Sequence, residues 1–159
     1  MYSITQRFEF DSGHRVLGHT GKCRFLHGHR YTAEITISPI DDHLNDLGMV
    51  IDFGDVKKII GTWIDEQWDH NMILHPDDPL LNEVEDPKGI IGRFPYIMPH
   101  DYPNPTAENL SKELWYKSHN LLVKYHMLKL NVEQVVLWET PNCRASFPAK
   151  VIQHETFRV

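Results

Sequence analysis

The sequence predicts an α+β fold in which a four-stranded antiparallel sheet carries two helices on one face. Two observations support this prediction. Stretches of alternating apolar and polar residues lie toward both ends of the 159-residue chain, and two stretches with helical periodicity lie between them. Helices grouped between strand pairs pack on one side of an antiparallel sheet. The pattern favours a single domain over residues 1–159, whose uncovered sheet face is expected to meet another subunit.

The first two predicted strands lie near the N-terminus and are expected to pair. Residues 2–10 place their apolar side chains on one parity. Residues 30–38 alternate apolar side chains with threonine and glutamate until Pro39 ends the run. Residues 48–53 are expected to be extended and to lead into the first helix.

The two predicted helices are amphipathic. The first covers residues 55–67, where five apolar side chains recur at helical spacing. They are Val56, Ile59, Ile60, Trp63 and Ile64. The second helix begins near residue 105. Either Asn104 is its N-cap with Pro105 at the first helical position, or Thr106 is the N-cap.

The remaining segments are a long loop and the C-terminal strands. Residues 75–103 hold six of the 10 prolines, which predicts an irregular loop, and loops of this length are usually functional or mobile. Residues 132–138 are predicted as a strong strand. Residues 144–147 and 151–157 are weaker strand candidates on either side of Pro148.

Composition argues against several classes of protein. The chain is 41% hydrophobic and 24% charged, with a formal net charge of −6. An acidic chain has no general attraction for nucleic acid or anionic membranes, so neither is expected as a partner. No apolar run is long enough to span a membrane and no secretory signal is recognisable, which predicts a cytoplasmic protein. In that compartment Cys23 and Cys143 are expected to be free thiols.

Three histidines near the N-terminus predict a metal site. His27 and His29 are separated by one residue at the head of a predicted strand, so their side chains point to the same side. His14 comes thirteen residues before His27, close to the end of the strand expected to pair with it. Three histidines with an open fourth position are typical of catalytic zinc sites, although iron, copper and nickel also accept imidazole. Gly28 would let a backbone or a substrate approach closely.

Cys23 lies four residues before His27 and has three interpretations. It could be a fourth metal ligand, a small buried hydrophobic residue, or a nucleophile or base. Positive charge favours the thiolate, and Lys22, Arg24 and a nearby metal ion would all supply it. We therefore prefer the interpretation as a nucleophile or base.

Two further positions carry carboxylates. Asp69 adjoins His70, and a carboxylate beside an imidazole can make a general acid/base pair. Capping of a helix end is the simpler alternative.

Glu139 ends the strongest predicted strand. A carboxylate there could accept two parallel N–H bonds from a planar edge such as that of guanine or a pterin. An exposed glutamate with no such role is again the simpler alternative.

Taken in order along the chain, these residues resemble the motifs of the 6-pyruvoyltetrahydropterin synthase family. Six blocks carry the resemblance, which runs from about residue 4 to residue 147. They are His14, Cys23-x-x-x-His27-Gly28-His29, residues 48–53 (GMVIDF), Asp69-His70, residues 105–109 (PTAEN) and residues 138–140 (WET). Animal members have five residues between the cysteine and His-Gly-His. The spacing of three found here is similar to that of the bacterial 6-carboxytetrahydropterin synthases.

The resemblance implies a T-fold that assembles into a multimeric barrel, commonly as stacked rings of a homohexamer, with active sites between subunits. It also implies roles for eight residues. His14, His27 and His29 would bind Zn²⁺; Cys23, Asp69 and His70 would form the catalytic proton-transfer set; Glu139 would anchor the pterin, with Thr106 lining the pocket.

The implied reaction converts 7,8-dihydroneopterin triphosphate to 6-carboxy-5,6,7,8-tetrahydropterin, acetaldehyde and triphosphate, in the biosynthesis of queuosine and deazapurine precursors. The alternative within the family is formation of 6-pyruvoyltetrahydropterin, in which triphosphate leaves and no carbon–carbon bond breaks. A non-catalytic zinc- or pterin-binding protein is a second alternative. It would not need Cys23, Asp69 and His70 together. A structural zinc site would instead use Cys23 as its fourth ligand.

Overall fold

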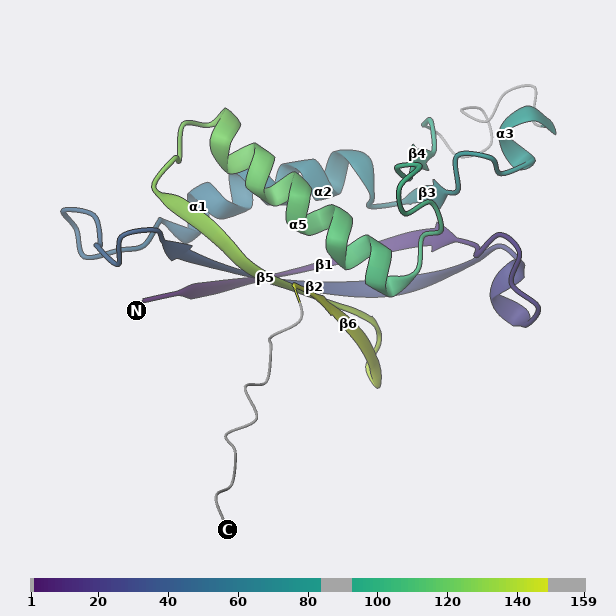
Figure 1. Cartoon of the computed structure of the whole chain (residues 1–159), viewed down its shortest axis with the longest axis horizontal. Helices are drawn as coiled ribbons and strands as arrows, with labels where there is room; N and C mark the ends of the chain where they lie inside the picture. Colours follow the sequence, from purple (N-terminus) through teal and green to yellow (C-terminus); the bar gives the residue numbers. More distant parts are fainter. Residues whose placement is uncertain (1, 84–92, 149–159) are drawn as a thin grey trace, which may run out of the picture.

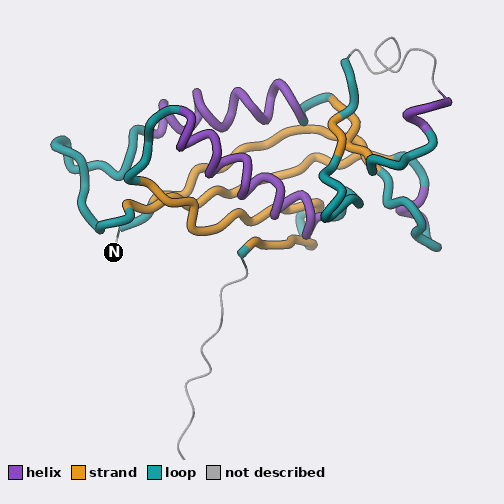
Figure 2. Tube along the Cα trace, turned by 45° about the horizontal axis from the view of Figure 1, so that its top comes forward, coloured by secondary structure: helices purple, strands orange, loops and turns teal. Residues whose placement is uncertain are grey.

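The computed structural model describes residues 2–83 and 93–148, which form one sheet covered on one face by helices (Figures 1 and 2). Six strands lie in the order β4-β3-β1-β2-β5-β6 across the described sheet. They are β1 (Ile4–His14), β2 (His27–Pro39), β3 (Asn71–Leu74), β4 (Tyr96–Ile97), β5 (Leu130–Thr140) and β6 (Cys143–Phe147).

Two helices cover the sheet, the first of them divided into three consecutive segments, and two short helices lie in loops. They are η1 (Lys22–Arg24), α1 (Phe53–Val56), η2 (Lys57–Gly61), α2 (Thr62–Gln67), α3 (Leu80–Glu83) and α5 (Ala107–Lys124). The segments α1, η2 and α2 follow one another as a single helix with a π-helical turn in its middle. This helix and α5 lie over the same sheet face, as predicted (Figure 1).

The predicted sheet of four antiparallel strands is wrong in strand number and in direction. The four long strands β1, β2, β5 and β6 pair antiparallel, but β3 and β4 extend the sheet beyond β1 as parallel strands. These two strands contain four and two residues, too few to show an alternating pattern. The strand β4 and the helix α3 also lie inside residues 75–103, where the prolines predict only an irregular loop.

The first two strands reach further toward the histidines than predicted. The ladder between β1 and β2 continues through the pairs Gly13↔Gly28 and His14↔His27. Glycine and histidine give no strand signal in the sequence, so the prediction ended early. The predicted strand at residues 151–157 lies outside the described residues.

The helix predicted for residues 55–67 is confirmed, with a start at Phe53. Its N-cap is Asp52, whose Oδ1 accepts a hydrogen bond from the backbone N–H of Gly54 at 2.6 Å. The extended run predicted just before it is wrong. Residues 48–52 contain bends, and the φ of Gly48 is 78°, in the left-handed region that glycine adopts readily.

Of the two N-caps proposed for the second helix, α5, Thr106 is the one found. Its hydroxyl accepts a hydrogen bond from the backbone N–H of Asn109. Pro105 therefore precedes the cap and is not the first helical residue. Asn104 has a different role. Its side chain accepts from the backbone N–H of Leu17 at 2.8 Å and donates to the carbonyl of Leu17 at 3.1 Å. This contact fastens the loop after β1 to the start of α5.

The core lies between the helices and the sheet. Phe10 and Tyr31 pair across β1 and β2, and their rings stack with centroids 5.3 Å apart. Gly61 brings the helix close to β1, since a Cβ there would lie 3.0 Å from the ring of Phe8. No helix in the described ranges combines the length and apolar character needed to cross a membrane.

The opposite sheet face is charged where β1 and β2 lie. Arg30 forms ion pairs with Glu9 at 3.2 Å and with Asp11 at 3.1 Å, and Arg7 pairs with Glu9 at 2.9 Å. These side chains are exposed. A partner subunit on this face remains a prediction.

A buried ion pair fastens the loop around residue 78 to the end of β1. Asp78 is fully buried and accepts hydrogen bonds from the Arg15 guanidinium, one of them at 2.7 Å from Nε. Arg15 directly follows His14, so the pair also holds the strand end that carries His14. Burial raises the pKa of Asp78, but the hydrogen bonds from Arg15 and from the N–H of Leu80 outweigh it and hold the pKa below its usual value.

We expect Asp78→Asn to lower the free energy of unfolding at pH 7 by about 2–4 kcal/mol, because it leaves a largely desolvated guanidinium without its carboxylate. The wild-type advantage is complete above the ordinary carboxyl pKa of about 4 and is lost as the pH falls through the lowered value. Urea unfolding at a series of pH values should show the two proteins converging in acid. Asp77→Asn, at an exposed neighbour, is the matched control. Equal midpoints for Asp78→Asn and wild type at pH 7 would contradict the expectation.

Candidate metal centre

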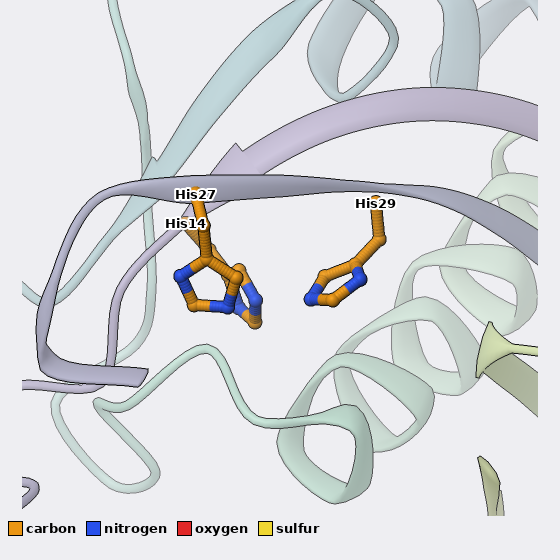
Figure 3. A group of neighbouring side chains, drawn as sticks. All are labelled: His14, His27 and His29. Carbon is orange, nitrogen blue, oxygen red and sulfur yellow. The ribbon is translucent and has the colours of Figure 1, made fainter. Parts of the chain in front are cut away.

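Three imidazoles converge at one end of the sheet, on the side that faces the helices. The register places His14 directly opposite His27, and strand alternation puts His29 on the same side as His27. Figure 3 shows the three rings projecting from the same side of β1 and β2. Their ring centroids lie 4.5, 5.0 and 5.2 Å apart. One ligand nitrogen from each ring lies within 4.8 Å of the other two, so the three could bind one metal ion.

Backbone carbonyls orient two of the three rings for metal binding. The Nδ1 of His14 lies 2.7 Å from the carbonyl oxygen of Pro105, and the Nδ1 of His27 lies 2.7 Å from that of Phe25. A carbonyl can only accept, so each Nδ1 carries the proton and each Nε2 is left with a free lone pair. This is the arrangement that protein metal sites use to fix the tautomer of a ligand.

The fit to a metal ion follows from the unpaired nitrogens. The Nε2 atoms of His14 and His29 are buried and have no hydrogen-bond partner among the described residues. A buried polar atom without a partner is costly, and a bound cation would satisfy both atoms at once. The residues present therefore fit a metal ion with imidazole ligands.

Two of the three histidines, His14 and His29, are also held in the protonation state that a metal ligand needs. Burial lowers the pKa of His14 to about 4, with smaller contributions from His27 and His29 in the same direction. Burial also lowers the pKa of His29, partly offset by the negative charge of Glu139. Both rings are therefore neutral at neutral pH, as metal binding requires.

Glu139 lies beside the three imidazoles. Its Oε1 is 3.6 Å from the Nε2 of His14 and 3.8 Å from the Nε2 of His29. The pairing of β5 with β6 is irregular between Trp138 and Thr140, which places Glu139 in a bulge. Bulges commonly re-aim a side chain beside a functional site.

Tyr31 belongs to the same site and was missed by the sequence reasoning. Its ring lies 5.9 Å from that of His14 and 5.6 Å from that of His29, and its buried hydroxyl has no partner among the described residues. Burial and the charge of Glu139 raise the pKa of this hydroxyl, so it is a neutral donor. The sequence did contain one indication of this. Tyr31 comes two residues after His29 in the same strand, so the two side chains point to the same face of the sheet.

Cys23 lies in η1, on the loop that joins the two histidine-bearing strands, and its side chain is exposed. Its carbonyl accepts from the N–H of Val16 at 2.8 Å. Within the described chain, the group of atoms able to share a metal ion contains the three histidines and does not include Cys23. The other cysteine, Cys143, is also free and exposed. A chemical role for Cys23 remains a prediction.

Asp69 and His70 form a hydrogen-bonded pair in the turn before β3. The Oδ2 of Asp69 lies 2.7 Å from the Nδ1 of the exposed His70, and its Oδ1 accepts from the N–H of Asp11 at 2.9 Å. His70 has a φ of 50° and donates its own N–H to the carbonyl of Asp11 at 2.7 Å. Burial raises the pKa of Asp69, but the N–H of Asp11 and the imidazole of His70 outweigh it and lower the pKa overall.

This pair lies apart from the histidine cluster. His70 lines an open pocket together with Asp11, Gly13 and Arg30, and His29 is the member of the cluster that reaches the same pocket. No hydrogen bond or ion pair joins His70 to the three imidazoles in the part of the chain that the structure describes. Thr106, the remaining predicted site residue, uses its hydroxyl as the cap of α5.

A sheet covered by two helices, with three imidazoles converging at one end, defines an α+β protein with a candidate three-histidine metal centre. The family model described as 6-pyruvoyl tetrahydropterin synthase matches residues 3–150, and the chain belongs to this family. Its fold is the T-fold predicted from the motifs.

Relatives and solved structures agree with this assignment. The chain is 43% identical over 143 residues to the 6-carboxy-5,6,7,8-tetrahydropterin synthase of Rickettsia felis, covering 90% of this chain and 97% of that one. It is 32% identical over 162 residues to the enzyme of the same name from Aquifex aeolicus, with coverages of 92% and 97%.

Two solved structures share the fold. An uncharacterised protein from Wolinella succinogenes superposes with a TM-score of 0.71 at 25% identity, covering 91% of this chain and 96% of that one. The 6-pyruvoyl tetrahydropterin synthase of Caenorhabditis elegans superposes with a TM-score of 0.61 at 19% identity, with coverages of 92% and 94%. The second likeness supports the fold alone.

We expect His29→Ala to weaken the binding of divalent metal ions by more than about 100-fold, because it removes one of three converging ligands. Competition between the protein and a chelating dye for Zn²⁺ and Co²⁺ would measure the loss. His43→Ala, which removes an exposed imidazole outside the site, should bind both ions like the wild type. Undiminished affinity in His29→Ala would show that the cluster is not the metal site.

Proposed function

We propose that this protein is a zinc-dependent 6-carboxy-5,6,7,8-tetrahydropterin synthase. It converts 7,8-dihydroneopterin triphosphate to 6-carboxytetrahydropterin, acetaldehyde and triphosphate, and so supplies queuosine and deazapurine precursors in the cytoplasm. The observation that carries the proposal is the convergence of three imidazoles in a chain that is 43% identical to a protein of that name over 90% of its length.

Zinc is the proposed metal because three imidazole nitrogens with room for another ligand suit it best. The Nε2 atoms of His14, His27 and His29 would hold it, with the carbonyls of Pro105 and Phe25 orienting two of the rings. A bound zinc ion supplies Lewis acidity, which makes the hydroxyls of the substrate side chain and the adjacent carbon easier to deprotonate.

The chain's own groups bind the substrate and move its protons. Glu139 would accept two N–H bonds from the pyrimidine edge of the pterin, with the Thr106 region lining the pocket. Cys23, flanked by Lys22 and Arg24, would take a proton as a thiolate. His70, held by Asp69, would deliver or accept a proton on another face of the substrate.

We also propose that the active sites lie between subunits of a homo-oligomer, the homohexamer of stacked rings that the family resemblance implies. The placement of Asp69 and His70 supports a shared site, because no hydrogen bond or ion pair joins this pair to the imidazole cluster among the described residues of one protomer. The charged face of the sheet would then line the interior of the barrel.

Two alternatives lead to different products. Formation of 6-pyruvoyltetrahydropterin would release triphosphate without acetaldehyde. A non-catalytic zinc- or pterin-binding protein would release neither, and it would have no use for Cys23, Asp69 and His70 together. The presence of all three favours an enzyme.

Incubation of the zinc-loaded protein with 7,8-dihydroneopterin triphosphate, followed by mass analysis, should give 6-carboxytetrahydropterin and acetaldehyde in equal amounts. Triphosphate with a pyruvoyl product would establish the first alternative. An unchanged substrate in the presence of fully loaded protein would remove both enzymatic proposals.

We expect Cys23→Ala to keep its zinc and to lose turnover by a factor on the order of 10²–10⁴, the usual contribution of a positioned acid or base. Cys143→Ala removes the other exposed thiol and serves as the matched control, with activity expected to be unchanged. Metal content and kcat should be measured on the same samples. Loss of zinc from Cys23→Ala would make Cys23 a ligand, contrary to the proposed role.

A further inference from the structure

The contacts of Glu139 are unusual for a carboxylate. Its side chain is 28% exposed, and no hydrogen-bond donor contacts it among the described residues. The nitrogen atoms nearest to it are the Nε2 atoms of His14 and His29, at 3.6 and 3.8 Å. The Nδ1 of His14 already carries the ring proton, so its Nε2 presents a lone pair to the carboxylate.

This arrangement is unfavourable unless a positive charge lies between the groups. The carboxylate oxygen and the lone pair on the Nε2 of His14 repel one another at such a distance, and the site is partly desolvated, which strengthens the repulsion. Ligand atoms around a tetrahedral zinc ion lie about 3.3–3.4 Å from one another, given metal–ligand bonds of about 2.0–2.1 Å. The observed separations exceed this spacing by about 0.2–0.5 Å. Relative to His14 and His29, Glu139 is therefore close to the position of a ligand.

We propose that the Glu139 carboxylate is the fourth ligand of the metal ion while no pterin is bound, and that an entering pterin draws it away. The second half rests on the proposed function. Glu139 is close to two of the three rings and is not part of the mutually close group formed by the histidines. It is thus the exchangeable member of the set, while the three imidazoles hold the ion permanently.

The exchange would couple recognition of the substrate to the release of one coordination position on the metal ion. A pterin offers the carboxylate two N–H donors in place of the ion, and charge-assisted pairs of this kind are strong. The vacated position then becomes available to oxygens of the substrate side chain. Compounds that carry similar hydroxyls and phosphates but no such N–H edge would leave the position closed, so the exchange contributes specificity.

Metal affinity tests the first half without any substrate. Glu139→Gln keeps the size of the side chain and removes its charge, and we expect it to bind Zn²⁺ on the order of 10- to 100-fold more weakly than the wild type in competition with a chelating dye. Glu139→Asp, which retains a carboxylate, should lose less. Glu133→Gln removes an exposed carboxylate from the same strand, one that bonds Ser38 and Asn131, and should bind Zn²⁺ normally.

The Co²⁺-loaded protein gives a second readout, because four-coordinate Co²⁺ absorbs visible light more strongly than Co²⁺ with additional water ligands. Glu139→Gln should show a several-fold weaker band than the wild type. Neopterin added to the wild type should change its band, and glycerol phosphate should not. Circular dichroism and thermal unfolding of each variant would confirm that it is folded.

Each outcome decides one part of the proposal. Equal Zn²⁺ affinity and equal Co²⁺ spectra for wild type and Glu139→Gln would overturn the ligand role and leave Glu139 as a pterin anchor only. Neopterin that fails to bind, or that binds without altering the Co²⁺ band, would overturn the exchange. Turnover is not read in these measurements, so a wild type inactive toward dihydroneopterin triphosphate would count against the proposed function alone.

Discussion

The pairing register of β1 and β2 is the constraint on which the candidate metal centre depends. In this register His14 lies opposite His27 and Phe10 lies opposite Tyr31. A slip of one residue would move every side chain of a strand to the other face. The stacked, buried rings of Phe10 and Tyr31 oppose such a slip, because it would expose one of the two to solvent. Hydrophobic packing in the core therefore fixes the positions of the three histidines at the end of the sheet.

The end of the sheet that carries the histidines is held by segments from distant parts of the sequence. The carbonyl of Pro105, just before the cap of α5, orients His14. The side chain of Asn104 fastens the loop after β1, and Asp78 binds Arg15 on the same loop. Because these contacts come from different elements, His14, a proposed metal ligand that is 2% exposed, stays oriented at the margin of a small domain.

Sequence reasoning predicted the long elements and the three histidines for physical reasons that are visible in the residues. Apolar and polar residues alternate along most of β2, and apolar residues recur at helical spacing over residues 56–64. Both patterns are long enough to be recognised. The short strands β3 and β4 have no such pattern, and their pairing depends on neighbours that are set by tertiary structure. The mixed sheet could not be predicted for this reason.

The site was predicted in part for similar reasons. Spacing brings His27 and His29 together, and the position of His14 near the end of the strand expected to pair with theirs added the third ligand. The resemblance to a family favoured a role for Glu139 over the simpler alternative of an exposed glutamate. The bulge that turns Glu139 toward the imidazoles depends on the pairing of β5 with β6, which the sequence does not reveal. The unpaired hydroxyl of Tyr31 is likewise a property of the packed core.

The glycine pair behind the histidines determines how closely β1 can approach its neighbouring strands. A Cβ on Gly28 would lie 3.1 Å from the carbonyl oxygen of Ser12, and one on Gly13 would lie 2.3 Å from the sulfur of Met72. A Cβ on Gly28 would push back the carbonyl of Ser12, and with it β1, by a few tenths of an ångström, whereas the flexible side chain of Met72 can move away from a Cβ on Gly13. The close approach of β1 and β2 at the candidate metal centre therefore depends mainly on Gly28, a residue that contributes no side chain.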